Sequence, residues 1–189
     1  MASICNLSTK KTNMLLCPVK LTCGTSEHIS HLSLLDTGAG ICHMTYPLWL
    51  NMQLHKICWN NNPQLCKLMG IESFDKMTFD TLPLISTISV LGDGSLAKVY
   101  EIKLDKLQLG LPSLGFNHCI ELDNVTVRLI NQDHAAFIVG WNVLKYLDIQ
   151  YNPSQFNCQL TLTDAGKQFF REERRNGISN YMQNMFNYS

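Results

Sequence analysis

The sequence predicts an all-β domain with a few added helices. Short apolar runs recur along most of the chain, and glycine, proline, asparagine and aspartate, which favour turns, stand between them. From residue 84 onward these runs follow one another closely, and the Asp-Gly pair at 93–94 separates two of them. Such a pair between β-rich runs is a strong hairpin signal. The 189 residues suffice for one core and are too few for two comfortable domains.

The first strands are predicted near the N-terminus. Residues 1–13 are polar and patternless, which indicates a flexible leader. Residues 14–23 form an apolar run interrupted by Pro18. A proline inside such a run predicts an edge strand or a bulge. Residues 29–35 predict a second strand, which ends at Asp36.

The next stretch predicts helices instead. Residues 41–70 are rich in leucine, methionine, tryptophan and cysteine and carry few charges. Within them, residues 47–57 predict a helix, because a proline such as Pro47 is tolerated in a first turn. Residues 64–69 predict a further helical turn, so that a helical segment spans about residues 47–70.

Strands return in the second half, together with two helices. The nearly continuous apolar run 134–139 is typical of a strand buried on both faces, and residues 141–147 predict a short helix. Asp164 is predicted to cap a C-terminal helix over 165–174. The other strands predicted in this half cover residues 84–90, 97–104, 107–110, 116–122, 125–130, 148–151 and 159–162.

Composition excludes several classes of protein. Fifteen basic residues balance fifteen acidic ones, which favours neither a nucleic-acid partner nor a strongly acidic one. No apolar stretch approaches the roughly 18 residues of a membrane span, and no signal-peptide core stands out. We therefore expect a soluble, cytoplasmic chain without a membrane partner. Its eight cysteines are dispersed through apolar segments, which favours buried reduced thiols over a disulfide framework.

A carboxylate at the end of a buried strand is the feature that needs a functional reason. Asp36 follows two leucines and precedes a threonine and three small residues, Gly38, Ala39 and Gly40. Burying a carboxylate is costly unless it is hydrogen-bonded or paired, and the glycines allow a tight turn. The simplest alternative is an aspartate that caps its own turn.

Three stretches together resemble a known family. Residues 34–39, Leu-Leu-Asp-Thr-Gly-Ala, resemble the active-site signature of the retropepsin-like aspartic proteases. Residues 136–144 resemble the family's second mark, two apolar residues and a glycine that lead into a short helix. Residues 91–95 stand where the family places its flap hairpin. The resemblance covers about residues 14–163, and its three marks fall in the expected order.

The resemblance implies a retropepsin-like closed barrel with a flap hairpin and one short helix after Gly140. It makes Asp36 the catalytic residue, because two carboxylates that share a proton can activate water and polarise a peptide carbonyl. The chain holds a single Asp-Thr-Gly, so a second copy must supply the other carboxylate. The sequence therefore predicts a homodimeric aspartic endopeptidase that hydrolyses a peptide or protein substrate without a cofactor.

Supporting roles follow from the same resemblance. Thr37 would hydrogen-bond across the two-fold axis, Gly38 would let the substrate backbone approach, and Ala39 would lie beside the cleft. Gly140 would permit close packing of the short helix behind the catalytic loop. The predicted flap tip, which would close over bound peptide, consists of Gly92, Asp93 and Gly94.

The sequence also departs from the compact members of the family. Residues 14–163 form the predicted protease domain, in which part of residues 50–84 is an insertion. This insertion is either a covering layer over the core or a surface that recognises a partner or substrate. Residues 164–189 form a C-terminal helical extension without a counterpart in the minimal viral enzymes. Gly40 and Ile41 stand where many relatives carry polar or β-branched residues, so the substrate specificity of relatives does not transfer.

Two other readings remain open. A retropepsin-like domain without activity could serve as a dimerising or peptide-binding module. A metal site is the weaker alternative, because the spacings of His28 with His31, Cys42 with His43, and His118 with Cys119 match no usual zinc pattern. A serine hydrolase is disfavoured because no Gly-x-Ser-x-Gly occurs.

Overall fold

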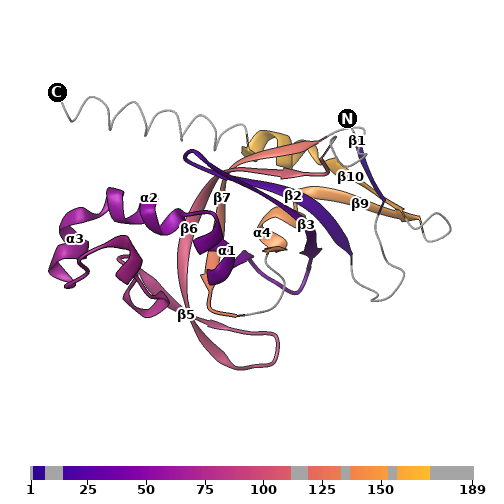
Figure 1. Ribbon diagram of the computed structural model, residues 1–189. Helices are drawn as coiled ribbons and strands as arrows, with labels where there is room; N and C mark the ends of the chain where they lie inside the picture. The colour runs from indigo at the N-terminus through magenta and orange to yellow at the C-terminus, as the bar shows by residue number, and fades with distance from the viewer. Residues whose placement is uncertain (1, 7–14, 112–118, 133–136, 153–156, 171–189) are drawn as a thin grey trace.

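The computed structural model describes residues 2–6, 15–111, 119–132, 137–152 and 157–170. Over these residues its strands form one large and one small sheet (Figure 1). In spatial order, the large sheet contains β2 (Leu16–Cys23), β3 (Ser26–Leu35), β8 (Phe137–Val139), β4 (Cys42–Thr45), β7 (Ile120–Ile130), β6 (Leu96–Leu109) and β5 (Ser86–Val90). The small sheet contains β1 (Ala2–Asn6), β10 (Asn157–Leu162) and β9 (Leu147–Asn152).

The large sheet closes on itself. Besides pairing with β3, strand β2 pairs with β6 from Val19 opposite Leu109 to Thr22 opposite Lys106. Within the described residues, six strands therefore form a ring in the order β2, β3, β8, β4, β7, β6, and β5 extends beyond it. Closure removes the exposed edges that an open sheet would present. The predicted all-β closed barrel with added short helices is confirmed.

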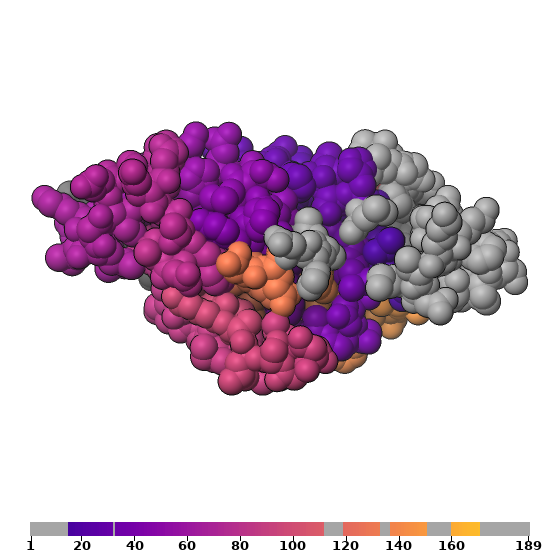
Figure 2. Space-filling model, turned by 60° about the horizontal axis from the view of Figure 1, so that its bottom comes forward, coloured from indigo at the N-terminus to yellow at the C-terminus, as the bar shows by residue number. Residues whose placement is uncertain are grey.

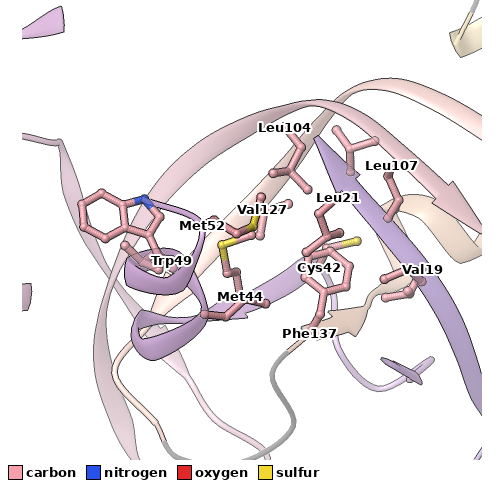
Figure 3. Close-up of a cluster of buried hydrophobic side chains, with 14 of the residues drawn as sticks. Val19, Leu21, Cys42, Met44, Trp49, Met52, Leu104, Leu107, Val127 and Phe137 are labelled. Carbon is pink, nitrogen blue, oxygen red and sulfur yellow. The ribbon is translucent and has the colours of Figure 1, made fainter. Parts of the chain in front are cut away.

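Apolar side chains from facing strands fill the inside of the ring. Val19 and Leu21 on β2 point toward Cys42 and Met44 on β4, and all four are fully buried (Figure 3). Alternate residues along a strand point to opposite faces, so each strand contributes every second side chain to this core. The same cluster includes Leu104, Leu107, Val127 and Phe137.

Pro18 lies where the pairing of β2 with β3 is irregular, which is one of the two outcomes that the sequence predicted. The register between β2 and β3 shifts between Cys17 and Val19. A proline lacks the N–H that a regular ladder needs, and a bulge accommodates it. The carbonyl of Pro18 accepts a hydrogen bond of 3.1 Å from the amide of Gly110. The prediction of a bulge is confirmed, and β2 is an inner strand and not an edge.

The helical segment packs against one end of the barrel (Figure 1). It begins with α1 (Tyr46–Asn51), α2 (Leu54–Asn61) and α3 (Pro63–Leu68), followed by two single turns, η1 (Phe74–Lys76) and η2 (Phe79–Thr81). The single helix predicted over 47–57 is wrong, because Gln53 takes a left-handed conformation with φ of 56° and separates α1 from α2.

This segment contributes to the same core as the barrel. Leu48, Trp49 and Met52 are buried in the core cluster, as are Phe79 and Leu82 after the helices. These contacts agree with a covering layer. The outer side of α3 and its end expose Leu65, Leu68 and Met69, and recognition by this surface stays a prediction.

Strands β5 and β6 form the predicted hairpin. The amide of Gly94 donates to the carbonyl of Leu91 at 2.9 Å, and the amide of Leu91 donates to the carbonyl of Ser95 at 2.9 Å. Gly94 has a φ of 82°, which glycine adopts without the penalty of a side chain. A turn followed by a residue at positive φ is a common three-residue hairpin connection, so the Asp-Gly signal located the tip correctly.

The chain ends differ from expectation in two details. Residues 2–6 form β1 and pair with β10. The prediction of a flexible leader is therefore wrong for these residues. The C-terminal helix is seen over residues 164–170, but Thr163 caps it in place of Asp164. The Thr163 hydroxyl accepts a hydrogen bond of 3.0 Å from the amide of Gly166. Asp164 instead lies in the first turn and pairs with Lys167 at 2.6 Å.

Parts of several predicted elements lie outside the described residues, namely residues 7–13 of the leader, 116–118 and 134–136 of two strands, and 171–189 of the C-terminal extension. Within the described part of the chain, no helix is long and apolar enough to cross a membrane. Six cysteines are free thiols, namely Cys17, Cys23, Cys42, Cys58, Cys66 and Cys119.

Candidate active site

Asp36 occupies the first position after β3, where the barrel backbone holds it directly. Leu34 and Leu35 pair in parallel with Ile138 and Val139 of β8. The amide of Asp36 continues this ladder by donating to the carbonyl of Val139 at 3.0 Å. The catalytic candidate is therefore attached to a buried pair of strands, although it belongs to a loop.

The loop folds back on the Asp36 side chain. The amide of Gly38 donates to Asp36 Oδ1 at 2.8 Å, and the amide of Ala39 donates to the Asp36 carbonyl at 3.3 Å. One carboxylate oxygen is thus oriented by the backbone, and the carboxylate is partly exposed. Asp36 thus caps its own turn, as the simplest alternative predicted. The Gly38 amide contacts only Oδ1, so Asp36 Oδ2 takes no part in this hydrogen bond.

The short helix α4 (Trp141–Leu144) holds the other end of the loop. The amide of Trp141 donates to the carbonyl of Ala39 at 2.6 Å, and the amide of Asn142 donates to the carbonyl of Gly40 at 3.0 Å. The first amides of a helix lack partners within the helix, and here they satisfy the carbonyls of the Asp36 loop.

Gly140 lies at the point of closest approach. A Cβ at Gly140 would overlap the carbonyl group of Ile41 and would lie 2.7 Å from the amide nitrogen of Cys42. Only glycine therefore lets the end of β8 run this close to the chain that leaves the loop. The amide of Gly140 donates to Cys42 Sγ at 3.3 Å.

Asn142 is a positioning residue that the sequence reasoning did not single out. Its Oδ1 accepts a hydrogen bond of 2.8 Å from the amide of Cys42, and its Nδ2 donates to the carbonyl of Thr126 at 2.9 Å. The side chain thereby joins α4 to β4 and β7. Its place two residues after Gly140, in the stretch already singled out, is the signal that could have found it.

The loop opens into a cleft of about 540 Å³. Asp36, Gly38 and Ala39 line it from the loop, and Gly92 and Asp93 line it from the hairpin tip. In Figure 2, which turns this side of the molecule forward, the pink surface of the hairpin runs along the lower edge, beside orange surface from later in the chain. Of the remaining predicted site residues, Thr37 is exposed in the loop, Gly94 completes the turn, and Gly140 lies behind the loop.

The wall of the cleft carries polar side chains that were not predicted as site residues. His43 on β4 pairs with Arg128 of β7 on one side and with Ile138 of β8 on the other. All three line the cleft together with Ser89 of the hairpin. Arg128 Nη1 donates to Ser89 Oγ at 3.0 Å. The signal that could have found them is a histidine between the apolar Cys42 and Met44, and an arginine between the apolar Val127 and Leu129.

Burial and charge both act on the His43 ring. Burial lowers the pKa of His43 below its ordinary value, the neighbouring Arg128 charge lowers it further, and Asp36 partly opposes them. His43 Nε2 and Arg128 Nε are buried, and neither has a hydrogen-bond partner among the described residues. Among those residues, no group of three or more His, Cys, Asp or Glu side chains is placed to hold a metal ion.

A scan against models of protein families and a search of curated proteins both found no match. Among solved structures, the chain is similar to a retropepsin-like aspartic protease from Rickettsia conorii, with a TM-score of 0.50 and 12% sequence identity. The similarity covers 85% of this chain and 89% of that one. At this identity the likeness concerns the fold, which is retropepsin-like.

Proposed function

We propose that this chain is an aspartic endopeptidase that works as a homodimer, with Asp36 of two copies forming one catalytic pair. The observation that carries the proposal is the position of Asp36, at the end of a buried strand and at the mouth of a cleft beneath the β5–β6 hairpin. The retropepsin-like fold supports it. A closed two-fold contact uses the same surface of both copies, and the exposed Thr37 beside Asp36 is available to such a contact.

The proposed chemistry needs one proton between two carboxylates. Like charges at close range do not both ionise readily, so one Asp36 is protonated while the other is ionised. The ionised carboxylate takes a proton from a water molecule as the water oxygen attacks the peptide carbonyl carbon. The protonated carboxylate donates its proton to the carbonyl oxygen. Collapse of the tetrahedral intermediate breaks the C–N bond, and the amine nitrogen leaves with a proton returned by the pair.

In this proposal the hairpin acts as a flap. Its tip residues Gly92 and Asp93 face the cleft, and the side chains of Val90 and Leu96 beside the tip are largely exposed. Apolar side chains in such a place would be covered by a bound peptide or by the second hairpin of the dimer. Closing over the substrate would exclude water from the reacting groups.

The test is cleavage of a peptide library between acidic and neutral pH, with and without pepstatin. Activity per chain should rise with protein concentration, because dilution separates the copies that share the site. Asp36→Asn should abolish cleavage and leave the circular dichroism spectrum unchanged. Cleavage that survives in Asp36→Asn would refute the assigned role of Asp36.

Mixing the two chains tests the shared site directly. Asp36→Asn is added to a constant amount of wild-type chain, and the copies are allowed to exchange. Mixed dimers should lack activity, so the cleavage rate should fall below that of the same amount of wild-type chain alone. A cleavage rate that does not change when the variant is added would indicate a complete site within one chain. A wild-type chain that binds peptides and cleaves none would support the alternative, a peptide-binding or dimerising module.

A further inference from the structure

We propose that His43, Ser89 and Arg128 form a subsite that binds the carboxylate of an aspartate or glutamate side chain in the substrate. The inference rests on the proposed endopeptidase function and adds a substrate class to it. The three residues come from β4, the hairpin and β7, and all line the cleft that contains Asp36.

Sheet register brings His43 and Arg128 together. His43 and Arg128 are directly paired across the parallel strands β4 and β7. Directly paired residues in a sheet project their side chains to the same face, and here that face is the cleft wall. Ile138, the partner of His43 on β8, supplies an apolar neighbour in the same row. In this arrangement His43 and Arg128 would contact the carboxylate of an acidic substrate residue, and Ile138 would contact its methylene groups.

Arg128 has unused hydrogen-bonding capacity. A guanidinium carries five N–H donors, of which Nη1 contacts Ser89 Oγ and the buried Nε has no partner among the described residues. Within that part of the chain no carboxylate forms a salt bridge with Arg128. The carboxylate of Asp93, across the cleft, already accepts hydrogen bonds from the amide and hydroxyl of Ser95 at 2.9 and 2.6 Å. A partly buried cation in this state favours an incoming anion, and a planar guanidinium binds a carboxylate through two parallel hydrogen bonds.

His43 and Ser89 complete the set. The buried His43 Nε2 lacks a partner among the described residues, and a neutral imidazole can donate one N–H to a carboxylate oxygen. Ser89 is buried, and its contact with Arg128 Nη1 fixes one arm of the guanidinium between β7 and the hairpin. In a two-fold dimer the subsite would occur twice, at equivalent distances on either side of the cleaved bond.

The test compares matched peptides that carry glutamate or glutamine at each position around the cleaved bond. The wild-type chain should prefer glutamate at one position on each side by about tenfold in kcat/KM, the effect expected of one charge-assisted contact. Arg128→Gln should remove this preference, so that the ratio of kcat/KM between the glutamate and the glutamine peptides falls to about one. Lys103→Gln is the matched control, because it removes one positive charge from an exposed position on the adjacent β6 and should keep the preference.

Each outcome decides between distinct conclusions. Cleavage without a glutamate preference, or a preference that survives Arg128→Gln, would overturn the subsite and leave the endopeptidase proposal intact. If no peptide is cleaved, the binding of the same fluorescent peptides to the Asp36→Asn chain takes over as the readout. Equal affinity for the glutamate and glutamine peptides there would overturn the subsite as well.

A folding defect would not obscure the result. If circular dichroism shows that Arg128→Gln does not fold, Arg128→Lys replaces it, because lysine keeps the charge and loses the planar fork. The glutamate preference should then fall by about threefold or more. An unchanged preference in Arg128→Lys would count against the proposed geometry.

Discussion

The amide of Gly140 donates a hydrogen bond to the thiol sulfur of Cys42 across 3.3 Å. This contact joins the end of β8 to the start of β4, and it brings the backbone of Gly140 against Ile41 with no space for a side chain. The loop from Asp36 to Gly40 connects β3, which pairs with β8, to β4. The position of Asp36 therefore depends on a glycine 104 residues further along the chain.

Gly140→Ala should lower the free energy of unfolding by about 3 kcal/mol, because the added Cβ overlaps backbone atoms that cannot rotate away. Urea unfolding followed by circular dichroism measures this change. The matched control is Gly40→Ala, since a Cβ at Gly40 meets nothing within 4 Å. Equal stability of the two variants would contradict the crowded geometry at Gly140.

Cys42 should be inert toward thiol reagents in the native protein. Burial raises the pKa of the Cys42 thiol to about 12, and the thiolate is the reactive form. Iodoacetamide at mildly alkaline pH, followed by mass spectrometry of peptides, should label Cys42 only after the chain is unfolded in denaturant. Native labelling of Cys42 as fast as in the denatured sample would show that β4 is not buried as described.

His43 should make stability depend on pH. Its pKa is lowered from 6.5, first by burial and then by the Arg128 charge. Between the lowered value and 6.5 the unfolded chain binds more protons than the folded one, so the free energy of unfolding decreases as the pH falls through this window. Urea unfolding at a series of pH values should show this decrease for wild type and a shallower one for His43→Gln. The same slope in both would mean that His43 does not titrate differently on folding.

Local turn chemistry accounts for the parts of the structure that were predictable. The Asp93-Gly94 pair located the hairpin tip because the turn needs a residue at positive φ, and Gly94 supplies it. Pro18 indicated a bulge because it cannot donate to a ladder. In both places the residue type and its neighbours contain the physical reason.

The features that were missed depend on distant partners. His43 and Arg128 are 85 positions apart in the sequence, and only the register of β4 against β7 places them side by side. Gln53 takes a left-handed conformation that no local pattern indicates, and it lies between α1 and α2, which pack against each other. The polar wall of the cleft was unpredictable for the same reason.

Gly94→Ala should loosen the hairpin tip without unfolding the barrel. Gly94 has a φ of 82°, and an alanine there is strained by about 1 kcal/mol even though its Cβ meets nothing within 4 Å. Hydrogen exchange of the amides of Leu91 and Gly94, which close the turn, should therefore accelerate about fivefold. Gly92→Ala is the matched control, because Gly92 has equal space and no positive φ. If both variants exchange at the wild-type rate, the turn does not depend on the conformation of Gly94, and a peptide-closing role of this tip would need another source of rigidity.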